Sequence, residues 1–417
     1  MAHAGSATAE PIGDRLPTRS PLPAGTSAGT SAASHRPRLE SVDVVRGVIM
    51  IVMALDHTRD FFGIPGQSPT NLATTTAALF LTRWITHFCA PVFFLLTGTG
   101  ARLSLRRKSP AELSRFLFTR GLWLIFLEVV LVRCFAYQFN FDYRLTMLVD
   151  LWALGWAMIV LSALVRLPAS VVAGFGVLLI AGHNLFDSVR SANPLWTVLH
   201  AQGVVLNTAG HVVFVAYPLI PWIGVTAVGY GLGAVYGWSP ERRRALLLRL
   251  GVGLSLAFLA IRSLDAYGDP ARWSAQKTAV FTALSFLNTT KQPPSLLFLL
   301  MTLGPAIVLL WVVDRGTPRM LRPALVIGKV PLFYYAGHFA LIHLLAVAVC
   351  YLRYGSAHWM FESPDLAHYP FSPPPGWGYS LPVVYLTWAF VVVAMYPLCR
   401  WFAALKRRRS DAWLSYL

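Results

Sequence analysis

Residues 41–63 have the sequence SVDVVRGVIMIVMALDHTRDFFG, in which ionisable residues interrupt a long apolar run. The apolar run at 42–62 has about the 20 residues that a helix needs to cross a bilayer. Nine further apolar runs of similar length follow it, near 79–101, 115–137, 145–165, 169–187, 211–236, 245–265, 295–313, 325–352 and 380–403. The sequence therefore predicts an all-α, polytopic membrane helical bundle of about ten transmembrane helices.

The composition favours a membrane protein over every other class. Of the 417 residues, 56% are hydrophobic and only 13% are charged, whereas soluble domains carry roughly 25% charged residues. The mean hydropathy of +0.56 also excludes a disordered chain. Four cysteines in this length exclude a disulfide-stapled scaffold. We therefore expect the lipid bilayer as the main partner, in a bacterial-type inner (plasma) membrane.

The net charge of +17 is explained by membrane topology. Most of the 35 Lys and Arg residues gather on one side of the predicted bundle, in the clusters 102–108, 242–249, 315–329 and 400–409 and near the N-terminus. The positive-inside rule places that side, and with it both termini, in the cytoplasm. No nucleic-acid recognition motif accompanies the charge, so we expect no nucleic-acid partner.

The chain divides into three segments by composition. Residues 1–38 are rich in Ala, Ser, Thr, Gly and Pro, which predicts a disordered cytoplasmic tail. They lack the apolar core of a signal peptide. Residues 39–404 form the membrane domain, and residues 405–417 form a basic cytoplasmic tail.

Arg46 and His57 are the leading candidates for function, since ionisable groups within a bilayer are costly unless paired or solvated. They are eleven residues apart, so they project on one face of a helix, roughly 16 Å apart along its axis. A donor with a phosphate head and a long, thin arm would place its phosphate on Arg46 and its reactive end at His57. The alternative is that Asp43 pairs with Arg46 at the membrane interface and that His57 merely ends the helix.

Asp56 precedes the histidine and does not fully share its helical face. It can orient the imidazole at the end of the helix, or it can pair with Arg59 or Arg83. Glu128 lies within a later apolar run and is expected either to pair across helices, with Arg46, Arg83 or Arg120, or to position the substrate or the histidine.

At these residues the chain resembles the transmembrane acyltransferase superfamily, which includes heparan-alpha-glucosaminide N-acetyltransferase and the bacterial polysaccharide O-acyltransferases of acyltransferase family three. The opening helix, RLESVDVVRGVIMIVMALDH (38–57), carries the Arg-x10-His spacing of family three. The stretches that resemble the heparan enzyme are HFCAPVFFLLTGTGARL (87–103), FVAYPLIPWIGVTAVGYGLG (214–233), QPPSLLFLLMTLGPAIVLL (292–310) and GKVPLFYYAGHFALIHLL (328–345). Residues 39–404 are therefore expected to be an acyltransferase-like domain.

The resemblance implies acyl transfer from a thioester, with acetyl-CoA or another acyl-CoA as donor and a glycan or amino sugar as acceptor. His57 holds the place of the family-three catalytic histidine. The heparan enzyme has an Asn there and an active histidine in the following outer loop, whereas residues 63–79 contain no histidine. His87 is the nearby alternative as the base, or packs between helices. Arg83 is a candidate donor to the oxyanion.

We thus expect His57, Asp56, Arg83 and His87 to be catalytic, and Arg46 with Asp43 to bind the donor. Glu128 and His338 are expected to support them, although His338 can instead join two helices by a hydrogen bond.

Histidines from several helices can also build a haem or di-metal site, here His57, His87, His338 and His343. No pattern typical of a cytochrome accompanies them, so we expect no metal. The alternative to an enzyme is a non-catalytic transporter of a small anionic solute, although the prolines that interrupt the runs are not arranged as two matching halves. A homo-oligomer is compatible with either hypothesis.

Overall fold

The computed structural model describes residues 40–366, 368–409, 411 and 414, and each predicted apolar run contains a helix. The helices of these runs are α1 (Glu40–Phe62), α2 (Ala77–Thr86), α3 (Cys89–Ser104), α4 (Pro110–Phe126), η1 (Leu127–Tyr137), α5 (Asp150–Leu164), α6 (Ala169–Gly182), α8 (Leu219–Val235), α9 (Pro240–Leu264), α11 (Leu296–Asp314), α13 (Pro331–Tyr354) and α14 (Leu381–Arg408). The connections contain η2 (His183–Phe186), α7 (Pro194–Leu199), α10 (Ala279–Leu287), η3 (Arg319–Leu321), α12 (Arg322–Gly328) and η4 (His358–Phe361).

Within the described residues, six helical stretches are long and apolar enough to cross a membrane. They are Ala77–Ser104, Ala169–Phe186, Pro240–Leu264, Leu296–Asp314, Pro331–Tyr354 and Leu381–Arg408. Helices α5 and α8 are apolar but shorter, while α1 and α4 carry more charged residues. The prediction of an all-α polytopic membrane protein is confirmed, and the number of ten crossings stays a prediction.

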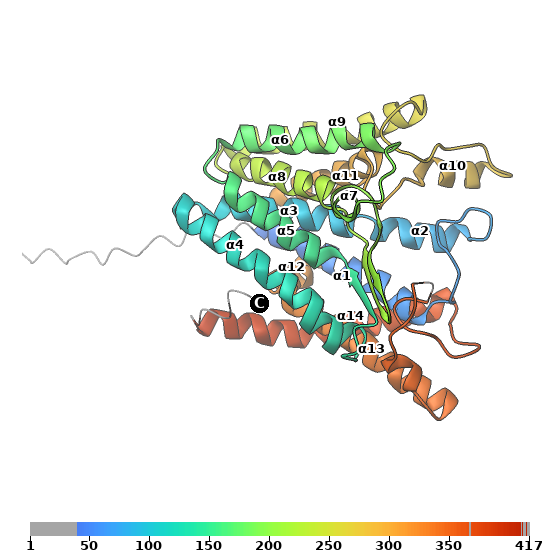
Figure 1. Cartoon of the computed structure of the whole chain (residues 1–417). Coiled ribbons are helices and arrows are strands. Elements are labelled where there is room, and N and C mark those ends of the chain that lie inside the picture. Colours follow the sequence, from blue (N-terminus) through green and yellow to red (C-terminus); the bar gives the residue numbers. More distant parts are fainter. Residues whose placement is uncertain (1–39, 367, 410, 412–413, 415–417) are drawn as a thin grey trace, which may run out of the picture. The chain divides into compact units, whose positions relative to one another are not determined.

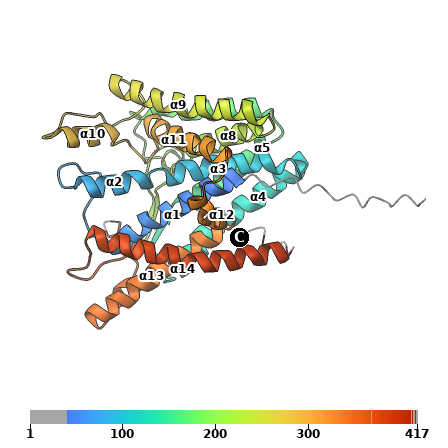
Figure 2. The same cartoon turned by 180° about the vertical axis from the view of Figure 1, so that it is seen from behind.

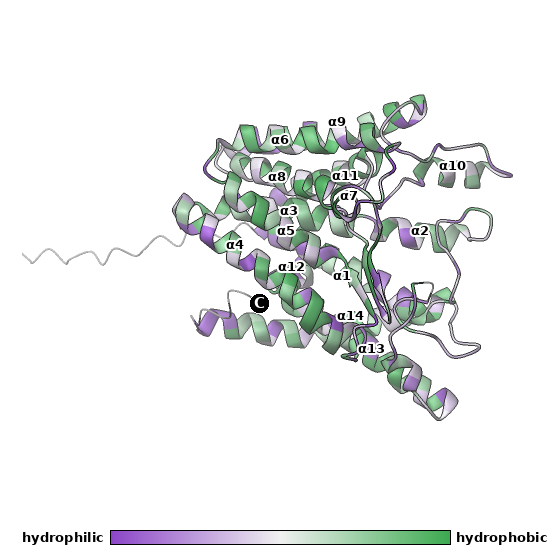
Figure 3. Ribbon diagram, viewed as in Figure 1, coloured by the Kyte–Doolittle hydropathy of each residue, from purple (hydrophilic) through white to green (hydrophobic). Residues whose placement is uncertain are grey.

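Helix α1 is an interior element of the bundle. It contacts α2, α3, α11, α12, α13 and α14 and lies among them in both views (Figures 1 and 2). By contrast, the apolar windows of α9 and α14 are each only 17% buried. Figure 3 shows hydrophobic residues along the outer helices α6 and α9. Such apolar outer surfaces suit a lipid surrounding, and the polar residues of α1 are turned inward.

Glycines set the close approach of α1 to α12. A Cβ atom on Gly47 would lie 1.8 Å from the carbonyl oxygen of Ala324, and one on Gly328 would lie 1.8 Å from that of Asp43. Small residues of this kind let helix backbones approach closely in membrane proteins. The contact fixes the first half of α1 against α12.

The basic clusters gather at one end of the bundle, which we call the basic end. There Arg106, after α3, donates to the carbonyl of Tyr236, after α8, at 2.7 Å. Arg243 of α9 pairs with Asp314 of α11 at 2.9 Å. In Figure 3 this end is on the left, where α4 and α14 carry hydrophilic residues. The opposite end, which we call the distal end, contains the C-terminus of α1, α2 and α10 (Figure 1).

Two parts of the predicted spans differ from uniform α-helix. Residues predicted to begin two spans instead form strands β1 (Leu145–Leu148) and β3 (His211–Val215), joined by β2 (Gly203–Thr208) in the order β1-β3-β2. Strands β1 and β3 are parallel, with Leu145 opposite Val212, whereas β2 and β3 are antiparallel. These apolar, partly β-branched segments suit strands as well as helices, and length alone did not separate the two. The run at 115–137 ends in the π-helix η1.

The expected tails lie largely outside the described residues. Residues 1–38, expected to be a disordered cytoplasmic tail, are not among them. At the other end, α14 continues to Arg408, beyond the boundary expected at residue 404. The basic residues 406–408 therefore belong to the last turns of a helix.

Candidate active site

The distal end of α1 carries a cluster of charged side chains on consecutive turns. Asp56 and Arg59, like His57 and Asp60, are three residues apart, a spacing that places helical side chains side by side. The guanidinium of Arg59 lies 2.9 Å from Oδ1 of Asp56 and 2.7 Å from Oδ1 of Asp60. Arg59, expected from the sequence only as one possible partner of Asp56, is therefore part of the site.

Asp56 joins α1 to α2. Its carboxylate pairs with Arg83 and accepts a hydrogen bond from Oγ1 of Thr86 at 3.0 Å. Asp56 is 8% exposed, and buried carboxylates require such partners. Of the two expectations for this residue, the structure supports pairing with Arg59 and Arg83. The carboxylate of Asp60, rather than that of Asp56, lies beside the His57 ring, with its Oδ2 at 3.8 Å from Nδ1.

His57 faces α13. Its ring centroid lies 4.0 Å from that of Phe339 and 5.3 Å from that of His338. Its Nδ1 atom is 3.8 Å from Oδ2 of Asp60, too far for a hydrogen bond. The side chain keeps 17% of its surface exposed, so the imidazole remains reachable.

His338 and His343, both on α13, have different surroundings. His338 is fully buried, and its Nδ1 lies 2.8 Å from the carbonyl oxygen of Tyr334. His343 contacts the carbonyl of Met360 through Nε2 at 2.8 Å and stacks on Phe139 at 4.0 Å. The structure thus brings His338 to His57 and leaves His343 in a packing role.

His87 lies where the predicted span 79–101 breaks into α2 and α3. Pro91 has no N–H to donate to the carbonyl of His87, and its ring clashes with that carbonyl in a continuous helix. The chain therefore turns at His87, whose ring is 3% exposed and lies 5.4 Å from Phe298. Electrostatic interactions connect it with Arg83 and Asp56, so it belongs to the same cluster.

Lys291, in the segment 288–295 before α11, completes the cluster and was missed from the sequence. It interacts electrostatically with Arg83, Asp56 and Asp60. Burial, together with the positive charge of Arg83, lowers the pKa of Lys291 to about 8. The only sequence signal was its position directly before the family-like stretch that starts at Gln292.

Glu128 has a different partner from those expected. Its Oε2 accepts a hydrogen bond from the backbone N–H of Leu151 at 2.8 Å, at the start of α5. The neighbouring Asp150 accepts from the hydroxyl of Tyr335 at 3.0 Å, and the Tyr335 ring lies 5.9 Å from His338. The expected ion pair with an arginine is therefore replaced by helix capping, because the free N–H groups of α5 attract a carboxylate.

Asp43 and Arg46 lie at the basic end of α1, away from His57. Arg46 pairs with Asp43 at 2.9 Å and donates to the carbonyl of Gly328 at 3.3 Å. The interfacial ion pair that the sequence allows is present. Donor binding by these two residues stays a prediction.

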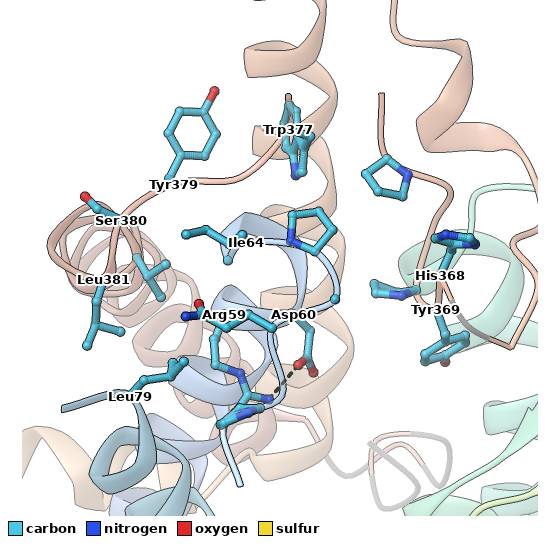
Figure 4. A pocket seen from close by; sticks show the side chains of 18 of the residues that line it. Arg59, Asp60, Ile64, Leu79, His368, Tyr369, Trp377, Tyr379, Ser380 and Leu381 are labelled. Atoms are coloured by element: carbon cyan, nitrogen blue, oxygen red, sulfur yellow. Dashed lines mark hydrogen bonds and ion pairs between the residues drawn. The ribbon is translucent and has the colours of Figure 1, made fainter. Parts of the chain in front are cut away.

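A cavity of about 720 Å³ adjoins the charged end of α1. Figure 4 shows Arg59 and Asp60 facing it from α1, with Trp377, Tyr379 and Tyr369 among the side chains around it. Its volume lies within the range of small-molecule sites, roughly 300–1,000 Å³. The cavity therefore opens beside Asp60, whose carboxylate lies 3.8 Å from Nδ1 of His57.

Four buried nitrogen atoms in this region make no hydrogen bond to the described residues. They are Nδ1 of His57, Nη1 of Arg59, Nδ1 of His87 and Nε2 of His338. Buried polar atoms are nearly always hydrogen-bonded, to the protein or to water. Their concentration near one cluster indicates a place that takes up a ligand or water.

The sequence matches the model of one known family. The family model described as Heparan-alpha-glucosaminide N-acetyltransferase, catalytic, matches residues 38–267. The chain belongs to this family. No curated protein shows significant similarity to it.

As a member of the heparan-alpha-glucosaminide N-acetyltransferase catalytic family, the chain is a membrane protein of the acetyltransferase type. The matched region spans α1 to α9 and contains Asp56, His57, Arg83 and His87, while Lys291 and His338 lie beyond it. The match establishes the family resemblance predicted from the sequence. The functional meaning of the Arg46-to-His57 spacing stays a prediction, and so do the roles of the individual residues.

Proposed function

We propose that this protein transfers an acyl group, acetyl in the first instance, from acyl-CoA to an amine or hydroxyl of a sugar. The donor approaches from the basic end, in the cytoplasm, and the acceptor from the distal, extracytoplasmic end. The observation that carries the proposal is the cluster of His57, His87 and His338 with the Asp56–Arg83 pair, next to a cavity. The family membership supports the acetyl group.

His57 is the proposed base. It removes a proton from the acceptor amine or hydroxyl, which attacks the thioester carbonyl; the C–S bond breaks, a C–N or C–O bond forms, and the proton passes to the departing CoA sulfur. The carboxylate of Asp60 lies 3.8 Å from Nδ1 of this ring. His87 is the second candidate for this role.

Arg59 is the better placed of two arginines to donate to the oxyanion of the tetrahedral intermediate. Arg83 already donates to Asp56, whereas Nη1 of Arg59 is buried and without a hydrogen bond to the described residues. A donor held in place before the reaction stabilises developing charge without reorganisation. Arg83 then holds Asp56, and through it Arg59, in position.

The cavity of about 720 Å³ is the proposed acceptor site. Its lining combines the charged pair Arg59–Asp60 with the rings of Tyr369, Trp377 and Tyr379. Sugars offer both hydroxyl groups for polar partners and apolar C–H faces for aromatic rings. An amino sugar would also bring a cation toward Asp60.

The test is acetyl transfer by the purified protein in detergent, measured as CoA release and acetylated product with glucosamine as the acceptor. Wild-type protein should be active, and His57→Ala should lose at least about 100-fold in rate, the usual size of general-base catalysis. His358→Ala, at an exposed histidine paired with Glu362, is the matched control and should keep full activity. Wild-type rates in both His57→Ala and His87→Ala would overturn the assignment, and anion transport without acetylation would favour the transporter.

A further inference from the structure

We propose that His183, Asp187 and His200 form a binding site for a divalent transition-metal ion, for which Zn²⁺ fits best. The three residues come from η2, from its end and from the end of α7. One potential ligand atom from each lies within 4.8 Å of the other two. None of the three belongs to the acyl-transfer cluster, and the sequence analysis, which expected no metal, did not identify them.

His183 is the observation that points to a ligand. The residue is 3% exposed, and neither buried ring nitrogen makes a well-formed hydrogen bond to the described residues. The backbone of Pro294 lies near the ring, in a geometry too poor to satisfy it. Leaving a buried polar group unpaired costs roughly 1–3 kcal/mol. A metal ion would supply the missing partner for one of these nitrogens.

The other two side chains are held by their neighbours. Asn184 donates to Oδ2 of Asp187 at 2.8 Å, while Oδ1 lies 3.9 Å from Nε2 of His200. The same Nε2 donates its N–H to the carbonyl oxygen of His183 at 2.9 Å, so binding an ion through Nε2 requires His200 to release this hydrogen bond. The ring packs against Trp196 at 4.7 Å. Hydrogen bonds to a ligating carboxylate and apolar packing around the ligands are typical of metal sites.

The ligand set selects the class of metal. Two imidazoles and one carboxylate suit Zn²⁺ and its neighbours Co²⁺ and Ni²⁺, whereas Ca²⁺ and Mg²⁺ require mostly oxygen ligands. Bonds of about 2.0–2.1 Å place tetrahedral ligand atoms roughly 3.3 Å apart. The present separations of up to 4.8 Å therefore require a small inward rotation of these side chains, and water can occupy the fourth position.

A metal ion at this site would hold the end of α6 close to the segment 288–295, which carries Lys291. Asn184 accepts a hydrogen bond from the N–H of Leu296, at the start of α11, at 2.9 Å. In the same region Asp269 accepts from the backbone and side chain of Thr290, both at 2.9 Å. A metal ion joining α6 and α7 would hold residues 290–296 in place, so we assign it a structural role.

The test is metal binding by the full-length, tag-free protein in detergent after treatment with a chelator. Wild-type protein should bind about one Zn²⁺ per chain with a rise in Tm, and Co²⁺ should give the visible ligand-field bands of a site with nitrogen and oxygen ligands. Asp187→Asn and His200→Asn should weaken binding at least about tenfold. His368→Ala, at an exposed histidine paired with Asp365, should bind like wild type.

Asp187→Asn is the variant most compatible with folding, because the amide has the size of the carboxylate. Its elution volume on gel filtration reports whether it folds. Wild-type protein that takes up neither Zn²⁺ nor Co²⁺, or a folded Asp187→Asn that binds Zn²⁺ with unchanged affinity, would overturn the proposal. Because the readout is metal content, the result is independent of acetyl transfer.

Discussion

At the scale of single residues, the charged part of the site depends on Asp56. Arg59, Arg83 and Thr86 all approach its two oxygens, so the first two helices meet at one carboxylate. The sequence offered Arg59 and Arg83 as alternative partners, and both are used. Lys291 was not predictable in the same way, because more than 200 residues separate it from Asp56. The residues around Lys291 do not indicate that its side chain lies near Asp56.

Asp56→Asn should lower both stability and activity. The amide keeps the size of the side chain but leaves the two arginines without their shared negative charge. We expect the free energy of unfolding to fall by roughly 1–3 kcal/mol, measured by denaturation in detergent, together with a loss of acetyl transfer. Glu362→Gln, in an exposed ion pair, is the control. A stability equal to that of wild type would show that the pairs do not hold α1 to α2.

Lys291→Met should change the dependence of stability on pH. The folded-state pKa is lowered from 10.5 to about 8, so keeping Lys291 charged disfavours folding at all pH values below about 8. That penalty is relieved as the pH rises from about 8 toward 10.5. The Tm of Lys291→Met should exceed that of wild type by on the order of a few degrees at pH 7, and the difference should shrink toward pH 10. A difference independent of pH would contradict the lowered pKa of the half-buried Lys291.

At the scale of elements, hydropathy located the helices but not their interruptions. The span predicted at 79–101 is two helices because of Pro91, and that break is what places His87 beside Phe298. The strands at 145–148 and 211–215 were predicted as starts of spans, because an apolar run is compatible with either conformation. Their pairing requires contacts more than 60 residues apart, which periodicity does not reveal.

Gly328→Val tests the contact that holds α1. A Cβ atom at Gly328 would meet the carbonyl of Asp43 at 1.8 Å, so α12 must move away and the Arg46 contact with the carbonyl of residue 328 is disturbed. Overpacking should lower the free energy of unfolding by about 1–3 kcal/mol. We therefore expect the Tm to fall by several degrees. The control is Gly174→Ala, which has open space around it and should be neutral or slightly stabilising. Equal stability of the two variants would contradict the close packing of α1 and α12.

At the scale of the whole molecule, α1 connects two different ends. Its first turns belong to the basic end, and its last turns carry the charged cluster beside the cavity. The grouping of basic residues at one end was predictable from their spacing along the chain. His57 and His338 lie on helices that are far apart in the sequence. Their proximity was predictable only because isolated polar groups are costly in a membrane and are therefore expected to lie together. The cluster of His183, Asp187 and His200 was not predictable, since local spacing joins only two of its members.

Arg46→Ala should weaken acetyl-CoA binding by about tenfold, the effect of losing one charge-assisted contact of roughly 1.4 kcal/mol. Arg46→Lys should restore binding only in part, because an ammonium cannot match a phosphate with two parallel hydrogen bonds. Calorimetric titration with acetyl-CoA in detergent measures both. Unchanged affinity in Arg46→Ala would leave Arg46 with a structural role, as in its pair with Asp43.

Acetyl transfer across a sealed membrane is the decisive measurement for the proposed function. Proteoliposomes would contain glucosamine inside and receive acetyl-CoA, which does not cross the bilayer, outside. For the wild type we expect N-acetylglucosamine inside the vesicles and free CoA outside, and for His57→Ala neither product. Absence of acetylated product from vesicles whose wild-type protein is folded, or equal product from His57→Ala, would contradict the proposed function.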